Sequence, residues 1–166
     1  MSKRIAIVAA IGLALAVTAT LPAQADFEDG NAAYAKRDYE TAFNAWLPLA
    51  EAGDPKAQNN IGFMFRKGRG TQINEGTAIY WYSRSAAQGF AEAMTNLGYM
   101  YDEGRTVEQD LVVSYMWFSL AADRGRQGAA GHLEVLETYL TPEEVAEAKR
   151  RAADWVEKPE AGAAAE

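Results

Sequence analysis

The sequence predicts an all-α protein, an α/α superhelical solenoid of helical hairpins with about eight helices after removal of an N-terminal signal. Two observations carry this prediction. An internal repeat runs through the middle of the chain with a period of 36 residues, and each copy divides into two helical segments at glycine and cap residues. The 166 residues are 49% hydrophobic and 23% charged, which is enough apolar material for a buried core in one domain.

Residues 1–25 have the three-part layout of a secretory signal, and we predict cleavage after Ala25. Lys3 and Arg4 give a positive start, an uncharged apolar run follows, and Ala23 and Ala25 supply the small residues before the cleavage point. The alternative is an uncleaved membrane anchor, but the run is short for a helix that needs ~20 apolar residues to span a bilayer. The sequence therefore predicts a periplasmic or secreted protein with no stable membrane insertion after cleavage.

The remaining chain, residues 26–166, is acidic. It carries 14 Lys and Arg against all 23 Asp and Glu, a formal charge of −9, because the signal region removes two cations and no acid. Such a chain repels phosphate backbones and anionic lipid, so we expect no nucleic acid partner. The absence of cysteine from the sequence excludes a disulfide framework, thiol chemistry and lipid attachment to an N-terminal cysteine.

Residues 26–53 form the first and shortest predicted hairpin. Its second helix begins after Asp38, following a turn several residues shorter than in the later units. Trp46 supplies apolar area for the core, and the unit ends near Gly53. Pro48 falls within the second helix, where a proline is expected to bend the axis.

The next two units, residues 54–89 and 90–125, match each other with ten identical positions, where chance gives about two. In the first helix of each unit, small and apolar residues recur four positions apart and therefore share one face. A glycine interrupts this helix, at a cost of ~1 kcal/mol, and we predict that it lets the second helix approach closely. These residues are Ala57, Ile61 and Phe65, with Gly62 and its counterpart Gly98.

The boundaries of the two helices are marked by local chemistry. Gly68 and Gly104 follow the first helix and suit the left-handed conformation that ends one. Asn74 and Asp110 are favourable N-caps for the second helix. Each second helix carries a pair of aromatic residues predicted to pack on the first helix, and a glycine at its end: Trp81-Tyr82 with Gly89, and Trp117-Phe118 with Gly125.

Residues 126–157 are not expected to continue the repeat and are predicted to form a closing helical hairpin. Its first helix spans 127–139. The second begins at Thr141-Pro142-Glu143-Glu144, which combines an N-cap Thr, a Pro at the first position and a Glu three residues after the cap. Residues 158–166 are predicted to be a flexible tail. The apolar side of the second helix comprises Val145, Ala148, Ala152 and Trp155.

The stretch Asp38-Tyr39-Glu40-Thr41-Ala42 makes residues 26–53 resemble a tetratricopeptide repeat, and residues 54–125 resemble Sel-one-like repeats, relatives with a longer turn. The matching pattern is Ala-x-x-x-(Leu/Ile)-Gly-x-x-(Tyr/Phe)-x-x-Gly, then Asn or Asp, then Trp-(Tyr/Phe)-x-x-(Ala/Ser)-Ala-x-x-Gly. Thr106 and Ser114 depart from it, where a second glycine and an alanine are usual. The resemblance implies an exported bacterial member of the tetratricopeptide superfamily.

The remaining motifs favour no catalytic, metal or cofactor site. His132 is the only histidine, so a zinc cluster is not expected, and we predict His132 near the surface of the C-terminal cap. Lys67-Gly68-Arg69-Gly70 lacks the Gly-Lys-(Ser/Thr) end of a phosphate loop and is interpreted as a turn. The paired acids Asp102-Glu103 and Glu143-Glu144 are expected to diverge on a helix surface. We therefore predict that the protein is not an enzyme and has no cofactor.

The first helix of each hairpin lines the concave face in tetratricopeptide-like solenoids, and this face is the predicted binding surface. Phe63 and Tyr99 have two open interpretations, as exposed anchors for a partner or as residues packed on the next helix. Arg66 and Asp102 predict a charge gradient that could orient a peptide. The predicted partner-binding residues are Asn31, Tyr34, Asn59, Phe63, Arg66, Thr95, Tyr99 and Asp102, with Ala35, Lys56 and Glu92 expected to be exposed beside them.

We therefore predict an adaptor or scaffold that binds an unidentified protein or peptide of the cell envelope. One alternative is a cell-envelope hydrolase, or an enzyme interacting with β-lactams or peptidoglycan, because some cysteine-rich relatives of the repeat family have been linked to β-lactam binding. The lack of cysteine and of a catalytic constellation disfavours it. Another alternative is a structural subunit whose solenoid edge pairs with a second copy.

Overall fold

The computed structural model describes residues 27–157, and the predicted signal (1–25) and tail (158–166) lie outside the described residues. Within this part the secondary structure is eight α-helices with no strand, which confirms the all-α prediction. None of these helices is long and apolar enough to cross a membrane. The helices are α1 (Phe27–Ala35), α2 (Tyr39–Glu51), α3 (Pro55–Lys67), α4 (Glu75–Ala87), α5 (Ala91–Glu103), α6 (Leu111–Asp123), α7 (Gln127–Leu136) and α8 (Pro142–Glu157).

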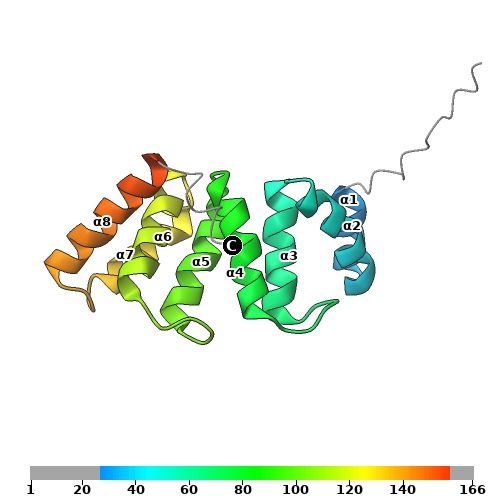
Figure 1. The fold of residues 1–166 in the computed structure, drawn as a ribbon, viewed down its shortest axis with the longest axis horizontal. Helices are drawn as coiled ribbons and strands as arrows, with labels where there is room; N and C mark the ends of the chain where they lie inside the picture. The colour runs from blue at the N-terminus through cyan, green and yellow to red at the C-terminus, as the bar shows by residue number, and fades with distance from the viewer. Residues whose placement is uncertain (1–26, 158–166) are drawn as a thin grey trace, which may run out of the picture.

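The helices stack in chain order into a solenoid, as Figure 1 shows from α1 at one end to α8 at the other. Three hairpins are formed by α1 with α2, α3 with α4, and α5 with α6. Each hairpin also packs on the next one, through α2 on α3, α4 on α5, and α6 on α7. This nearest-neighbour packing is the architecture of a repeat solenoid and confirms the predicted fold.

The predicted helix boundaries follow from local hydrogen bonds. Asn74 accepts a hydrogen bond from the Thr77 amide at 2.9 Å, and Asp110 accepts one from the Val113 amide at 2.9 Å. These bonds satisfy amides that the first turn of a helix leaves without partners. At the other ends, Gly68 and Gly104 adopt φ of 64° and 61°, the left-handed conformation that glycine takes without strain.

The glycines inside the first helices set the distance between the helices of a hairpin. A Cβ atom at Gly62 would lie 2.8 Å from Cδ1 of Tyr82, and one at Gly98 would lie 2.9 Å from the ring of Phe118. Both distances are too short for a real carbon contact. The predicted close approach is therefore confirmed, and the aromatic rings of α4 and α6 lie directly against the backbone of α3 and α5. Ser114 strengthens the second contact by donating to the Gly98 carbonyl at 2.9 Å.

The buried side chains form two apolar clusters, one around the first hairpin and one around the third. Trp46 belongs to the first cluster and Phe118 to the second. Trp81 and Tyr82 are adjacent on α4, yet Trp81 packs into the first cluster and Tyr82 into the second. The helix α4 therefore joins the two halves of the core.

The C-terminal helices differ from the predicted hairpin in their packing. Both α7 and α8 pack mainly on α6 rather than on each other. The buried Ala129 and Leu136 of α7 stand 36 residues after Ala93 and Met100 of α5, so α7 continues the register of the earlier first helices. It ends at Leu136, three residues before the predicted end at Tyr139.

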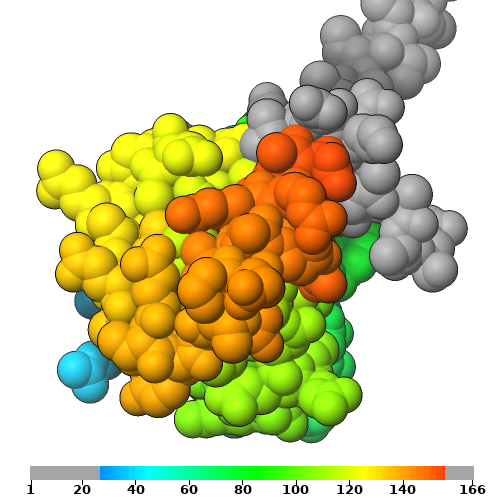
Figure 2. All heavy atoms as spheres, turned by 90° about the vertical axis from the view of Figure 1, so that its left-hand side faces the viewer, coloured from blue at the N-terminus to red at the C-terminus, as the bar shows by residue number. Residues whose placement is uncertain are grey.

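The helix α8 begins as predicted. The Thr141 amide donates to the Glu144 carboxylate at 2.8 Å, and the Glu144 amide donates to the Thr141 hydroxyl at 3.3 Å. Ala148 and Ala152 are buried against the second cluster, with Val145 beside them. Figure 2 looks onto this end of the molecule and shows α8, in orange, lying across it.

Candidate functional site

A groove of about 320 Å³ crosses α1, α3 and α5, the first helices of the three hairpins, and Trp46 of α2 also lines it. It runs diagonally, because its lining residues lie in the C-terminal half of α1, the middle of α3 and the N-terminal half of α5. The residues that line it, which we call the groove residues, are Asn31, Tyr34, Trp46, Asn59, Asn60, Phe63, Glu92 and Asn96.

Aromatic rings form the α1 end of the groove. The ring centroids of Tyr34 and Trp46 lie 5.5 Å apart, and those of Phe27 and Trp46 lie 5.9 Å apart. The Trp46 indole N–H donates to the Phe27 carbonyl at 3.1 Å. Because this donor is used inside the protein, Trp46 offers the groove an apolar surface and no hydrogen bond.

Arg69 lies behind these rings. Its guanidinium carbon is 5.5 Å from the ring centroid of Tyr34 and 5.3 Å from those of Tyr39 and Phe63. It also donates a hydrogen bond to the Tyr34 hydroxyl. Arg69 directly follows Gly68, whose left-handed conformation ends α3, so it reaches the rings from the turn after that helix. Three cation–π contacts hold one cation beside the groove.

Carboxamides line the rest of the groove. Asn96 of α5 donates to the Asn59 side-chain oxygen of α3 at 2.9 Å, which joins two neighbouring hairpins. Asn31 donates to the Glu28 carboxylate at 3.2 Å. The side chain of Asn60 is half-buried and makes no hydrogen bond to any residue that the structure describes. The groove therefore offers amide donors and acceptors between apolar walls.

Four of the eight predicted binding residues meet in this groove: Asn31, Tyr34, Asn59 and Phe63. Their exposure differs from the prediction in one case. Asn59 was expected on the surface but is 4% exposed, because its side chain is covered by the bonded Asn96. Phe63 is half-buried, with one side against Arg69 and another on the groove.

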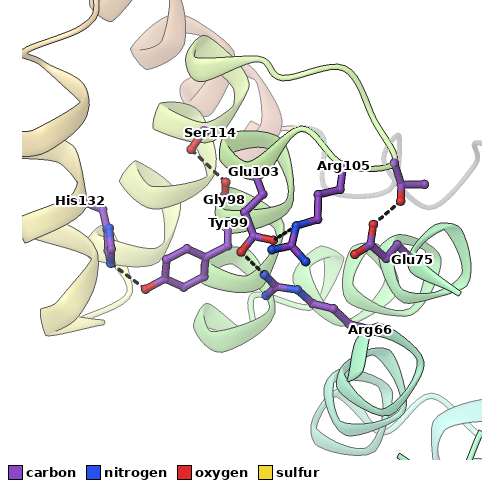
Figure 3. Close-up of polar contacts among 9 residues, drawn as sticks. Arg66, Glu75, Gly98, Tyr99, Glu103, Arg105, Ser114 and His132 are labelled. Atoms are coloured by element: carbon purple, nitrogen blue, oxygen red, sulfur yellow. Dashed lines mark hydrogen bonds and ion pairs between the residues drawn. The ribbon is translucent and has the colours of Figure 1, made fainter. Parts of the chain in front are cut away.

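Tyr99 and Thr95 do not lie in the groove. Tyr99 packs edge-on against Phe118 at 5.2 Å, and its hydroxyl is 2.7 Å from Nε2 of His132 (Figure 3). Of the two interpretations of Tyr99, the structure shows packing on neighbouring helices. Thr95 is only 7% exposed and its hydroxyl donates to the Ala91 carbonyl, so the expected exposure of Thr95 is wrong.

His132 of α7 is half-buried at the C-terminal end of the solenoid. Its ring stacks on Phe118 at 4.7 Å, with 17° between the planes. Asp102 lines a separate pocket of about 500 Å³ beside His132. This second pocket lies between α5, α6 and α7 and shares no lining residue with the groove.

The predicted charge gradient between Arg66 and Asp102 is not present. Arg66 forms an ion pair with Glu103 at 2.5 Å, and Arg105 approaches the same carboxylate at 3.5 Å (Figure 3). The Arg66 side chain is 9% exposed, so its charge is neutralised inside the protein. Near it, burial raises the pKa of Tyr82, an effect that the Arg66 guanidinium opposes.

Sequence reasoning missed several groove residues. Asn60 and Asn96 are identical across the 36-residue offset, and this repeated polar residue was an available signal. Glu92 was expected to be exposed but was not assigned to binding. Within residues 27–157, no cluster of His, Asp and Glu side chains is placed to hold a metal ion.

The family model of the Sel1 repeat matches residues 55–90 and 91–125. A crystal structure of a protective antigen from uropathogenic Escherichia coli, which displays an SLR fold, is similar with 25% identity and a TM-score of 0.75 over 82% of this chain. A Sel1 repeat protein from Oxalobacter formigenes is similar with 30% identity and a TM-score of 0.65 over 78%. This chain spans only 30% and 55% of those two proteins, respectively. No curated protein matches the chain.

Proposed function

We propose that this chain, which contains two Sel1 repeats in an α/α solenoid, is a non-catalytic adaptor that holds an extended peptide segment of a protein partner in the groove. The observation that carries the proposal is the combination of carboxamides and aromatic rings across three consecutive hairpins. Residues 1–25 support a periplasmic or secreted location for this role.

The carboxamides fit the chemistry of a peptide backbone. Each carboxamide both donates and accepts hydrogen bonds, as a peptide group does. Asn60 makes no hydrogen bond to the described residues and therefore offers both functions to a ligand. Tyr34 and Phe63 add half-buried rings, and such rings are favoured as anchors in binding surfaces.

The proposal is tested by selecting random peptides displayed on phage against the purified protein and measuring the affinity of enriched peptides. Phe63→Ala should raise Kd by about tenfold or more, because it removes an aromatic anchor. Asn60→Ala should raise Kd roughly fivefold, the effect of one lost hydrogen bond.

Matched controls separate the groove from the rest of the surface. Ile73→Ala removes an exposed apolar side chain from the turn after α3, and Asn44→Ala removes an exposed carboxamide from α2. Both variants should bind the enriched peptides as the unchanged protein does. The proposal fails when no peptide is enriched, or when the groove variants bind as tightly as the controls.

A further inference from the structure

Two side chains of opposite charge stand at the two ends of the groove, and of these only Glu92 lines it directly. Arg69 stands behind Tyr34 and Phe63, at the α1 end. Glu92 lines the groove in the first turn of α5, at the opposite end. Between them the groove residues are asparagines and aromatic side chains, which carry no charge.

Arg69 is held in place but is not neutralised. The three rings around its guanidinium fix its position, and Tyr34 accepts one of its five N–H groups. No carboxylate among residues 27–157 forms an ion pair with it. An arginine whose side chain is already ordered binds a carboxylate with little further loss of conformational entropy.

Glu92 is exposed and forms no ion pair with a described residue. It stands one helical turn before Asn96, so the two side chains share a face of α5. Lys56 occupies the corresponding position on α3, but it neither lines the groove nor pairs with Glu92.

Two other charges near the groove are engaged within the protein. Arg66 pairs with Glu103, and Glu28 accepts a hydrogen bond from Asn31. Building on the proposed function, we propose that the groove selects peptides by charge polarity, with an acidic side chain at Arg69 and a basic side chain at Glu92. Opposite charges at two ends of a neutral groove fix the orientation of a ligand, because the reversed peptide places like charges together.

The proposal predicts the composition of the selected peptides. Peptides enriched on the unchanged protein should carry one acidic and one basic residue at a constant spacing. Replacing either residue of the peptide by Gln should raise Kd roughly two- to fivefold, as expected for an ion pair at a partly exposed site. The binding of the charged peptide should weaken as salt is added, whereas the doubly Gln-substituted peptide should respond less.

Charge reversal provides the sharpest test. Glu92→Lys should reverse the preference at one position, so that a peptide with Glu in place of its basic residue binds more tightly than the original. Glu134→Lys makes the same change on an exposed residue of α7 and should leave the preference unchanged. Arg69→Gln should abolish the preference for the acidic residue, and Arg126→Gln is its control. If Arg69→Gln disturbs folding, the Gln-substituted peptides test the same contact on the unchanged protein.

The outcomes distinguish this proposal from the proposed function. Peptides that are enriched without a charge preference, or a Glu92→Lys variant that keeps the original preference, would overturn the charge polarity while peptide binding stands. Enrichment of basic but not acidic residues would overturn the role of Arg69. A selection that enriches no peptide on the unchanged protein would overturn the proposed function itself.

Discussion

Gly98 and Gly131 both lie inside helices, but only Gly98 faces another helix. A Cβ atom at Gly98 would lie 2.9 Å from Cε2 and Cζ of Phe118, whereas one at Gly131 meets nothing within 4 Å. Gly98→Ala and Gly131→Ala therefore add the same methyl group, the first at a tightly packed helix contact and the second at a site with free space around it.

The two variants should differ in their free energy of unfolding. Replacing a helical glycine by alanine favours the helix by ~1 kcal/mol at either site, so this gain cancels in the difference between them. Phe118 is 1% exposed and cannot retreat, because Tyr99 and His132 pack against its ring. Overpacking of this kind costs about 1–3 kcal/mol. We expect Gly98→Ala to be less stable than Gly131→Ala by that amount.

Urea unfolding of both variants and of the unchanged protein measures this difference. Far-UV circular dichroism and tryptophan fluorescence should report coincident transitions, which the comparison of free energies requires. Gly131→Ala serves as the control and should raise the free energy of unfolding by about 0.5–1 kcal/mol. If both variants are stabilised equally, Gly98 does not set the distance between α5 and α6, and the reasoning is refuted.

Trp117→Ala should lower the free energy of unfolding by about 3–5 kcal/mol, since Trp117 is 8% exposed, and a change below ~1 kcal/mol in urea unfolding would contradict its place in the core. Replacing Arg66 and Glu103 by Gln, singly and together, should give a coupling of about 1 kcal/mol in a double-mutant cycle, and additive effects would show that the ion pair does not form in solution. Burial and the hydrogen bond to Glu137 raise the pKa of Tyr115 from 10.0 to about 12, so the stability that its neutral form confers is complete below pH 10 and is lost as the pH rises towards 12. Tyr115→Phe should flatten that alkaline loss in urea unfolding at successive pH values, and an unchanged slope would contradict the assignment.

The fold was predictable because its signals are local or repeated. Caps such as Asn74 and turns such as Gly68 act within a few residues, so their chemistry is visible in the sequence. The register of α7 was missed for a physical reason. Ala129 and Leu133 stand 36 residues after Ala93 and Leu97. The residue 36 positions after Gly98 is Glu134, so α7 lacks the glycine that indicates close helix packing.

The candidate site was predictable only in part, because it depends on how side chains reach between hairpins. The repeat placed Asn59 and Thr95 on the correct helices, but burial depends on a small rotation of each helix about its axis, which the spacing does not specify. The pairing of Arg66 with Glu103 depends on two flexible side chains meeting across α3 and α5. Arg69 reaches its three rings through a turn between helices, outside the repeat's helical pattern.

The diagonal course of the groove makes its width a property of the whole solenoid. Its walls come from three hairpins, and each hairpin is held chiefly by its immediate neighbours. Small rotations at the two interfaces between consecutive hairpins therefore add up from α1 to α5. A molecule held at both ends of the groove would oppose those rotations, so that its affinity and the stiffness of the solenoid would rise together.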